Sequence, residues 1–337
     1  MKAMEISGAW DLENIQPVMR PEPKAGPGEV VIAMKAISIN PRDRVVAMGG
    51  YGRLANLPLV PLCDGAGIIA DIGPGVSDFT EGELVCPNYS RTWLHGTISR
   101  ESYPGAHGMA VDGTAQELFV IPAAAVVRAP KHLTAREAAT LPCAAVTAWN
   151  AVVEQGRVRA GERILIQGTG GVALFALQFA KMHGAEAIVT SSDDKKLERV
   201  RELGADHRIN YRSNPDWEKA VRDITDGEGV DNIVEVGGAG TLAKSLSCVA
   251  PSGTVSVIGI LSGISGEVNL GPMVTRNIRL QGITVGGRDM FCNMVQAMEL
   301  HQTRPVIHDT SFAFDELGAA LAALPEEQHF GKLVCEL

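Results

Sequence analysis

The sequence predicts an α/β protein in which a doubly wound parallel sheet is inserted into a mostly β domain. Three observations predict this fold. The chain up to about residue 122 is rich in glycine, proline and short β-type runs. Six short apolar runs between 163 and 284 mostly alternate with helical patterns, and the chain closes with a helical segment and a further strand. Such alternation is typical of β-α-β units, whose parallel strands are covered by helices on both faces.

Each element is justified by its local pattern. Strands are expected at 29–40, 66–73 and 114–122, where β-type runs are bounded by Pro and Gly turns. The apolar runs predicted as parallel strands are RILIQG, AIVTSS, HRIN, DNIVEVGG, TVSVIGI and IRLQGIT. A helix over about 289–301 and a strand within the last residues complete the pattern.

A helical stretch precedes the first parallel strand. Thr134 and Glu137 form a capping box, Pro142 starts a second helix in its first turn, and Gly156 ends that helix. We therefore expect the inserted domain to span 126–284, and the enclosing domain to comprise 1–125 and 285–337.

Composition excludes several classes of protein. The 337 residues carry a net charge of −9, whereas a nucleic-acid-binding domain needs a basic face. The sequence has no run of about 18 apolar residues, so no membrane span is predicted. Acidic residues interrupt the start of the sequence, where a signal peptide would be apolar. The six scattered cysteines form no C-x-x-C pair, which favours reduced thiols and a cytoplasmic location.

A glycine loop lies where the first parallel strand turns into a long apolar helix. Gly168, Gly170 and Ala173 fit the pattern G-x-G-x-x-G/A. The first glycine permits a tight turn, the second lets a pyrophosphate approach the backbone, and the helix N-terminus offers N–H groups to the phosphates. This pattern at a strand–helix junction predicts a dinucleotide site. The alternative is a tight connection without a ligand.

A second match occurs at Gly238, Gly240 and Ala243, after DNIVEV. We favour the first loop because only that loop opens a succession of β-α-β units. The second loop is expected to face the same crevice, since the carboxyl ends of parallel strands share one edge of a sheet.

The end of the second parallel strand bears on cofactor choice. An NAD site usually carries an acidic residue there, which binds the ribose hydroxyls and repels a 2′-phosphate. Here Ser191 and Ser192 hold those places, and Lys196 follows one helical turn later. Two hydroxyls and a lysine bind a phosphate through charge-assisted hydrogen bonds, so the sequence favours NADP(H) over NAD(H). The alternative is a helix cap at Asp193 with solvated charges beside it.

Six segments together resemble the medium-chain dehydrogenase/reductase superfamily, and specifically its zinc-less, quinone-oxidoreductase-like members. They are SINPRD (38–43), VPLCDGAGII (60–69), ATLPCAAVTAWNAV (139–152), GTGGVALFALQFAK (168–181), ELGADHRINYR (202–212) and HFGKLV (329–334). The resemblance covers essentially the whole chain. It implies a Rossmann domain inserted in a GroES-like catalytic domain, a cleft between them for nicotinamide and substrate, and a homodimer.

The resemblance also implies individual roles. The residues matching Ser192, Lys196 and Tyr211 hold the 2′-phosphate of NADP in that family, and Lys332 of the terminal GK is expected to serve the cofactor. The full set of expected cofactor contacts is Gly168, Thr169, Gly170, Gly171, Val172, Ser191, Ser192, Lys196, Tyr211, Gly237, Gly238, Ile260, Thr147, Phe330 and Lys332.

A catalytic zinc is the main open question. The positions that hold zinc in metal-dependent relatives read here Asn40, Cys63, Asp64 and Cys143. Asn is a poor zinc ligand, but two thiolates, a carboxylate and water are enough to hold the ion. The alternative is that both cysteines are small apolar fillers and that Asp64 stabilises a turn. We expect no zinc.

Without a metal, hydrogen-bond donors must stabilise the charge that grows on the substrate oxygen. Quinones and α,β-unsaturated carbonyls spread that charge over a conjugated system, so a metal-free site favours such acceptors. Tyr51 and Asn40 are the expected catalytic residues, with Asn88 and Tyr89 as further candidates. Asp43 is expected to orient the NPRD turn, and His95 and His107 are expected to be ordinary polar loop residues.

The sequence therefore predicts an NADPH-dependent reductase of a small carbonyl compound. Two alternatives remain. One is an NAD(P)-dependent alcohol dehydrogenase that interconverts alcohols with ketones or aldehydes, and the other is a non-catalytic NADPH-binding protein.

Overall fold

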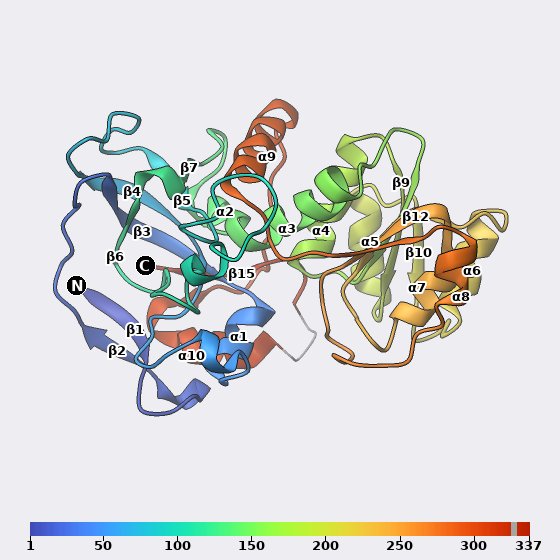
Figure 1. The fold of residues 1–337 in the computed structure, drawn as a ribbon, viewed down its shortest axis with the longest axis horizontal. Coiled ribbons are helices and arrows are strands. Elements are labelled where there is room, and N and C mark those ends of the chain that lie inside the picture. The colour runs from blue at the N-terminus through green and yellow to red at the C-terminus, as the bar shows by residue number, and fades with distance from the viewer. Residues whose placement is uncertain (325–328) are drawn as a thin grey trace. The chain divides into compact units, whose positions relative to one another are not determined.

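The computed structural model describes residues 1–324 and 329–337 and divides into two compact units (Figure 1). Unit 1 comprises Met1–Val146 and Gly286–Leu337, and unit 2 comprises Thr147–Val285. The first boundary thus lies some twenty residues later than the expected 125/126. The reason is that residues 126–128 form a strand which pairs with residues 85–87 of unit 1, and that residues 135–138 and 141–145 also contact strands of unit 1.

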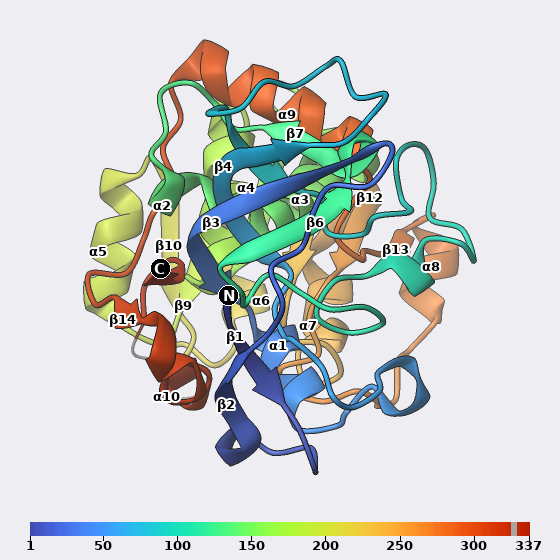
Figure 2. The same cartoon turned by 90° about the vertical axis from the view of Figure 1, so that its left-hand side faces the viewer.

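Unit 1 is built on a mostly antiparallel sheet whose main path runs β14-β15-β3-β4-β5-β7, with β6 also paired to β3. Figure 2 shows β3, β4 and β6 lying side by side in this sheet. A separate two-stranded sheet joins β1 to β2. The strands of unit 1 are β1 (Lys2–Ile6), β2 (Ile15–Met19), β3 (Glu29–Ile39), β4 (Asp64–Ile72), β5 (Leu84–Pro87), β6 (Leu118–Pro122), β7 (Val126–Arg128), β14 (Phe312–Ala313) and β15 (Leu333–Glu336).

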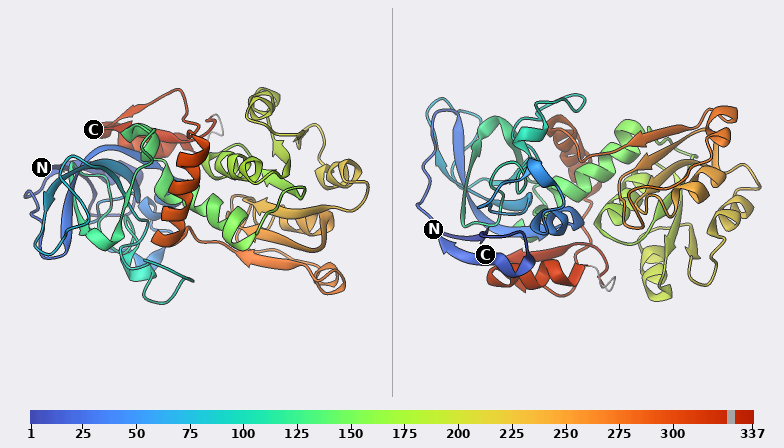
Figure 3. Two further views of the ribbon diagram at one scale, coloured as in Figure 1. Left: turned by 90° about the horizontal axis from the view of Figure 1, so that it is seen from above. Right: turned by 60° about the horizontal axis from the view of Figure 1, so that its bottom comes forward.

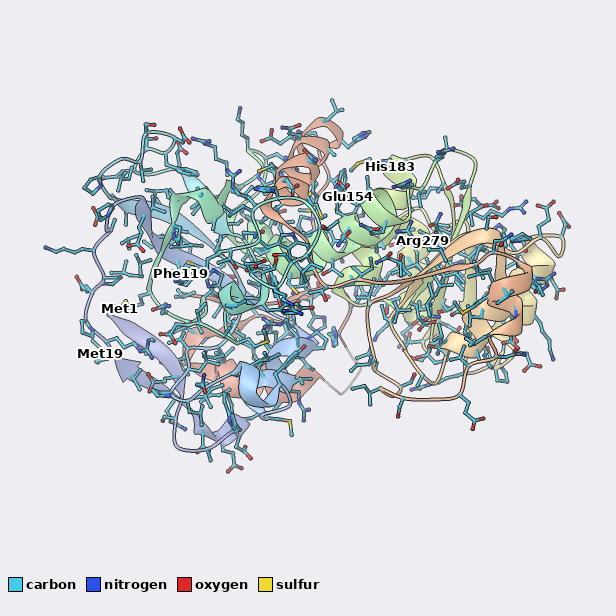
Figure 4. All side chains as sticks on the ribbon, in the orientation of Figure 1. Met1, Met19, Phe119, Glu154, His183 and Arg279 are labelled. Carbon is cyan, nitrogen blue, oxygen red and sulfur yellow. The ribbon has the colours of Figure 1, made fainter. Side chains whose placement is uncertain are left out.

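The core of unit 1 lies under this sheet. Ile32, Ile37 and Phe119 are among its fully buried side chains, and Phe119 is labelled on β6 in Figure 4. The helices are α1 (Pro41–Ala47), α2 (Ala135–Ala138), α9 (Arg288–His301) and α10 (Leu317–Ala323). Short 3-10 turns lie at Leu12–Asn14, Gly52–Leu54, Tyr103–Gly105, Ala123–Ala125 and Phe314–Glu316. The methionines of α9 (Met290, Met294 and Met298) are buried.

Unit 2 contains a six-stranded parallel sheet in the order β10-β9-β8-β11-β12-β13. This is the 3-2-1-4-5-6 order of a dinucleotide-binding fold, with the switch in strand order between β8 and β11. The strands are β8 (Arg163–Gln167), β9 (Glu186–Ser191), β10 (His207–Asn210), β11 (Val230–Glu235), β12 (Val249–Val257) and β13 (Arg279–Gly282). The six apolar runs of the sequence therefore form the six predicted strands.

Helices pack on both faces of this parallel sheet, as the two views of Figure 3 show. They are α3 (Val146–Trp149), which the unit boundary divides, α4 (Gly171–Met182), α5 (Asp194–Glu202), α6 (Trp217–Ile224), α7 (Leu242–Cys248) and α8 (Gly271–Thr275). Two π-helical turns, Leu141–Ala145 and Asn150–Gln155, flank α3. The predicted capping box is confirmed, because Thr134 accepts from the Glu137 backbone and Glu137 accepts from the Thr134 backbone.

The doubly wound topology and the mostly β enclosing unit are both confirmed. Within the described part of the chain, no helix combines the length and the apolar character that crossing a bilayer requires.

Candidate active site

The glycine loop has the geometry of a phosphate site. Gly168 follows β8 with φ = +82°, a left-handed conformation that glycine adopts without strain. Gly170 is extended and precedes α4, and a Cβ placed on it would meet no heavy atom within 4 Å. The first N–H groups of a helix have no partner inside the helix, so those of α4 are available to a ligand. The loop therefore fits the pyrophosphate of a dinucleotide.

The second glycine run is organised by a buried acid that we did not single out from the sequence. Glu235, at the end of β11, is fully buried. Its Oε1 accepts from the N–H groups of Gly237 (2.8 Å) and Gly238 (3.0 Å), and its Oε2 accepts from Gln167 Nε2 (2.7 Å). Gln167 directly precedes Gly168. One carboxylate therefore connects the two strand ends that flank the switch point, and the amides of Gly237 and Gly238 are already in use.

The end of β9 carries the predicted 2′-phosphate residues. Ser191 is buried, Ser192 and Lys196 are half-buried, and Tyr211 follows β10 and donates its N–H to the Ser191 carbonyl at 3.0 Å. Asp193 caps α5, because its side chain accepts from the Lys196 N–H at 3.0 Å. Asp193 is thus the helix cap that the alternative interpretation predicted. The hydroxyl of Ser192 has no hydrogen-bond partner among the described residues.

The remaining predicted cofactor residues are spread over both units. In unit 2, Thr169 and Thr147 are buried, Gly171 and Val172 begin α4, and Ile260 is 55% exposed. In unit 1, Phe330 and Lys332 are buried. Their roles toward a cofactor stay predictions.

A buried polar cluster occupies unit 1 where β3 ends and α1 begins. Asp43 accepts from the Asn40 N–H at 2.9 Å, which confirms that it orients the NPRD turn. Asn40 Nδ2 donates to Asp64 Oδ2 at 2.9 Å and to Asp43 Oδ2 at 3.4 Å. Both amide protons of Asn40 are therefore engaged inside the protein, which differs from the donor role toward substrate that we expected.

Lys332 is the centre of this cluster. Its Nζ donates to Asn40 Oδ1 at 2.5 Å, to the Ile39 carbonyl at 2.9 Å and to Asp64 Oδ2 at 3.0 Å. An ammonium has three protons, and all three are used here. In this arrangement all three protons of Lys332 are used inside the protein, and its expected role toward the cofactor stays a prediction.

The possible metal ligands lie close together. Ligand atoms of Cys63, Asp64 and Cys143 are all within 4.8 Å of one another. However, Asp64 Oδ1 accepts from the Cys143 N–H at 2.7 Å, and Oδ2 accepts from Ser38, Asn40 and Lys332. Asp64 also lies at the start of β4 rather than in a turn. The carboxylate oxygens of Asp64 thus already accept hydrogen bonds from protein donors, and the Lys332 ammonium balances the negative charge of Asp64.

Cys63 does not compensate for this. Burial, with the hydrogen bond to Cys143 adding to it, raises the pKa of the Cys63 thiol well above its usual value, whereas zinc binds thiolates. The hydrogen bonds of Asp64 and the burial of both cysteines favour the alternative in which the cysteines pack as small apolar residues. The three side chains are nevertheless close enough together to hold a metal ion.

The phenols remain as open donors. Tyr51 is 36% exposed, and Tyr89 is 7% exposed; neither hydroxyl has a hydrogen-bond partner among the described residues. Burial raises the pKa of Tyr89, and the nearby Cys63, Cys143 and Tyr51 add to the increase, so that its phenol stays protonated. Asn88, in contrast, donates to the Ser90 and Trp93 carbonyls and holds a loop.

The two histidines differ. His107 is fully buried, its ring contacts Phe119 edge-on at 5.0 Å between centroids, and burial lowers its pKa to about 3. It is a neutral core residue rather than the loop residue we expected. His95 lies in an irregular segment and lines a surface hollow of about 700 Å³ with residues of α9.

Two family descriptions match the chain. Residues 26–131 match the alcohol dehydrogenase GroES-like domain, and residues 171–299 match the zinc-binding dehydrogenase domain. The zinc-type alcohol dehydrogenase-like protein C1773.06c of Schizosaccharomyces pombe is 41% identical, over 99% of this chain and 97% of its own length. The chain belongs to the medium-chain dehydrogenase/reductase superfamily. Within it, the protein is alcohol-dehydrogenase-like, and it is an NAD(P)H-dependent oxidoreductase.

Two further relatives bear on this oxidoreductase. The crystal structure of a putative alcohol dehydrogenase from Sinorhizobium meliloti 1021 superimposes with a TM-score of 0.92 at 40% identity, covering 100% of this chain and 98% of that one. A 2-haloacrylate reductase from a Burkholderia species is 32% identical over 73% of this chain and 69% of its own length. The family match agrees with the GroES-like and Rossmann assignments of units 1 and 2.

Proposed function

We propose that this oxidoreductase uses NADPH to reduce a quinone or an α,β-unsaturated carbonyl compound, without catalytic zinc. The observation that carries the proposal is the state of Asp64, whose oxygens accept four hydrogen bonds from protein groups, one of them from Lys332. A carboxylate so occupied is a poor ligand, and the neighbouring ammonium repels a dication. A conjugated acceptor needs less electrostatic help than a simple ketone, because it delocalises the charge that hydride addition creates.

When bound, NADPH supplies the hydride. The residues that would hold it are those of unit 2. The loop Gly168–Gly171 and the start of α4 would bind the pyrophosphate, and Ser192, Lys196 and Tyr211 would bind the 2′-phosphate. Because Ser191 and Ser192 take the place of an acid at the end of β9, nothing at those two positions repels that phosphate.

Unit 1 supplies the acceptor's donors in this proposal. Tyr51 and Tyr89 carry hydroxyls that have no hydrogen-bond partner among the described residues, and burial raises the pKa of Tyr89 above its usual value. A phenol can donate a hydrogen bond to the acceptor oxygen and relay a proton from solvent. Asn40 then holds Lys332 and Asp64 in place instead of touching the substrate.

The names of the relatives support two substrate classes. The 2-haloacrylate reductase supports reduction of an activated C=C bond, whereas the alcohol-dehydrogenase-like relatives support the interconversion of alcohols and carbonyls. A spectrophotometric screen of NADPH and NADH consumption over quinones, enones, aldehydes and ketones separates them. Turnover of quinones or enones with NADPH supports the proposal. Activity confined to simple alcohols and ketones would instead establish an alcohol dehydrogenase.

We also propose that the protein is a homodimer formed through β13. This strand is an edge of the parallel sheet, because it pairs only with β12 in the described structure. Exposed apolar side chains accompany it, namely Ile260, Leu261, Ile264, Leu270, Val274 and Leu280. An exposed edge strand flanked by such a surface favours pairing with a second copy. Light scattering should give twice the chain mass, and Leu280→Asp combined with Val274→Asp should give a monomer.

A further inference from the structure

A buried arginine lies beside the thiol pair of unit 1. Arg42 is the second residue of α1, and only 11% of its side chain is exposed. Its Nη1 donates to Asp43 Oδ1 and to the His107 carbonyl, both at 3.2 Å. Its guanidinium carbon lies 5.1 Å from the centroid of the Tyr89 ring. One side of the guanidinium is therefore fixed by the protein.

The other side of this guanidinium is not satisfied. Arg42 Nη2 is buried and has no hydrogen-bond partner among the described residues. Such a group costs free energy unless something accepts from it, and the cost is largest for a charged donor. Its neighbours Cys63 and Cys143 offer only weak sulfur acceptors. These N–H groups are therefore open to an oxygen acceptor from outside the cluster, such as water or a substrate.

Two other basic groups near Arg42 cannot donate to an oxyanion. All three protons of Lys332 are used by Ile39, Asn40 and Asp64. His107 is neutral, because burial and the positive charges of Arg91 and Arg42 lower its pKa to about 3. Arg42 therefore remains as a permanent positive charge beside the thiol pair that still has N–H groups to donate, and the Nε of Arg91 is likewise buried without a partner among the described residues.

We propose that Arg42 is a catalytic residue that stabilises the negative oxygen formed on the acceptor when hydride is added. The inference rests on the reductase function proposed above and names the group that takes over the electrostatic task of a metal. Hydride addition to the β-carbon of an enone breaks the C=C π bond, and the electron pair moves through the carbonyl to its oxygen. Arg42 Nη2 donates to that oxygen. A proton from solvent then reaches the α-carbon, and NADPH has become NADP⁺.

The geometry leaves one terminal nitrogen of Arg42 open to a developing oxyanion. A carboxylate prefers two parallel hydrogen bonds from one guanidinium. Here Nη1 is held by Asp43 and His107, so that a carboxylate cannot bind end-on across both terminal nitrogens. A group buried to this extent also acts through a low dielectric, where a fixed charge stabilises a new one more strongly than it does in water.

The test compares Arg42→Gln and Arg42→Lys with the wild type, and uses Arg44→Gln, two residues further along α1, as the matched control. The acceptors are a neutral enone, its analogue bearing a carboxylate, and a quinone. Loss of one oxyanion donor typically lowers kcat by about 100- to 1000-fold. We expect Arg42→Gln to lower kcat on both enones by about that factor with little change in KM, and to affect the quinone less. Arg42→Lys, which keeps the charge, should lose less than Arg42→Gln, and Arg44→Gln should retain wild-type kcat.

Two readouts separate catalysis from a structural role. The Kd for NADPH should be the same in Arg42→Gln and the wild type, and added methylguanidine should restore part of the enone activity of Arg42→Ala. Wild-type activity in Arg42→Gln overturns the inference while leaving the proposed reductase intact. A loss confined to KM for the carboxylate-bearing enone also overturns it, because Arg42 would then anchor substrate. If Arg42→Gln does not fold, Arg42→Ala replaces it in the test. A kcat of Arg42→Ala equal to that of the wild type, with no further increase on addition of methylguanidine, then refutes the inference. A wild type inactive on all three acceptors refutes the reductase function itself.

Discussion

Replacing Lys332 by methionine removes the cation of a buried ion pair. The ammonium is 3% exposed, and its partner Asp64 is 0% exposed. Removing one member of such a pair typically costs about 3–5 kcal/mol, because the remaining charge stays buried without its partner. Asp64 keeps hydrogen bonds from Ser38, Asn40 and the Cys143 N–H, so the lower end of this range applies. We expect Lys332→Met to lower the free energy of unfolding by about 3 kcal/mol.

Urea denaturation of Lys332→Met, Asp64→Asn and the double variant measures this cost. The double variant should lose less than the sum of the single losses by about 2 kcal/mol, since the two residues interact directly. The Kd for NADPH should change by less than about threefold, because the ammonium has no proton left for a phosphate. Additive losses would contradict the coupling. A stable Lys332→Met protein that binds NADPH at least tenfold more weakly would restore Lys332 as a direct cofactor ligand.

Three further predictions follow from single contacts. Lys196→Ala should weaken NADPH binding by at least tenfold and should change NADH binding little. Lys195→Ala, at the exposed neighbouring position, should change the binding of neither cofactor. Equal losses of affinity for both cofactors in Lys196→Ala would exclude a 2′-phosphate site at Lys196. Burial raises the pKa of Asp43 to about 6, so between about pH 4 and 6 the folded protein binds a proton that the unfolded chain releases. The free energy of unfolding of the wild type, relative to that of Asp43→Asn, should therefore fall by up to about 3 kcal/mol as the pH rises through this window and stay constant above it. A difference between the two proteins that does not change with pH would contradict this prediction. Glu235→Gln should weaken NADPH and NADH equally, because it loosens the strand ends at Gln167 and Gly237 and leaves Lys196 untouched; isothermal titration would contradict this if only one cofactor is affected.

Much of the fold could be predicted from local pattern. The six parallel strands follow from apolar runs of strand length separated by helical periodicity, and the turn at Gly168 follows from the need for a positive φ at a strand–helix junction. The unit boundary near Val146 could not be predicted in this way. It depends on the pairing of β7 with β5, which is a long-range contact without a local signal.

The candidate site was predictable in its residue types but not in its contacts. Asn40, Asp64 and Lys332 were all singled out from the sequence, yet their mutual hydrogen bonds join β3, β4 and β15, which are far apart in the chain. Two residues were missed. Glu235 had a signal, since an acid that ends a buried apolar run needs donors around it. Arg42 had none, because a charged residue in the first turn of a short helix is usually solvated.

The central claim is that hydride transfer in this protein proceeds without a metal ion. The most direct test is the NADPH-dependent rate of enone or quinone reduction after exhaustive treatment with a zinc chelator. The account predicts a kcat/KM equal to that of untreated protein. Loss of activity that returns only when zinc is added back would contradict it.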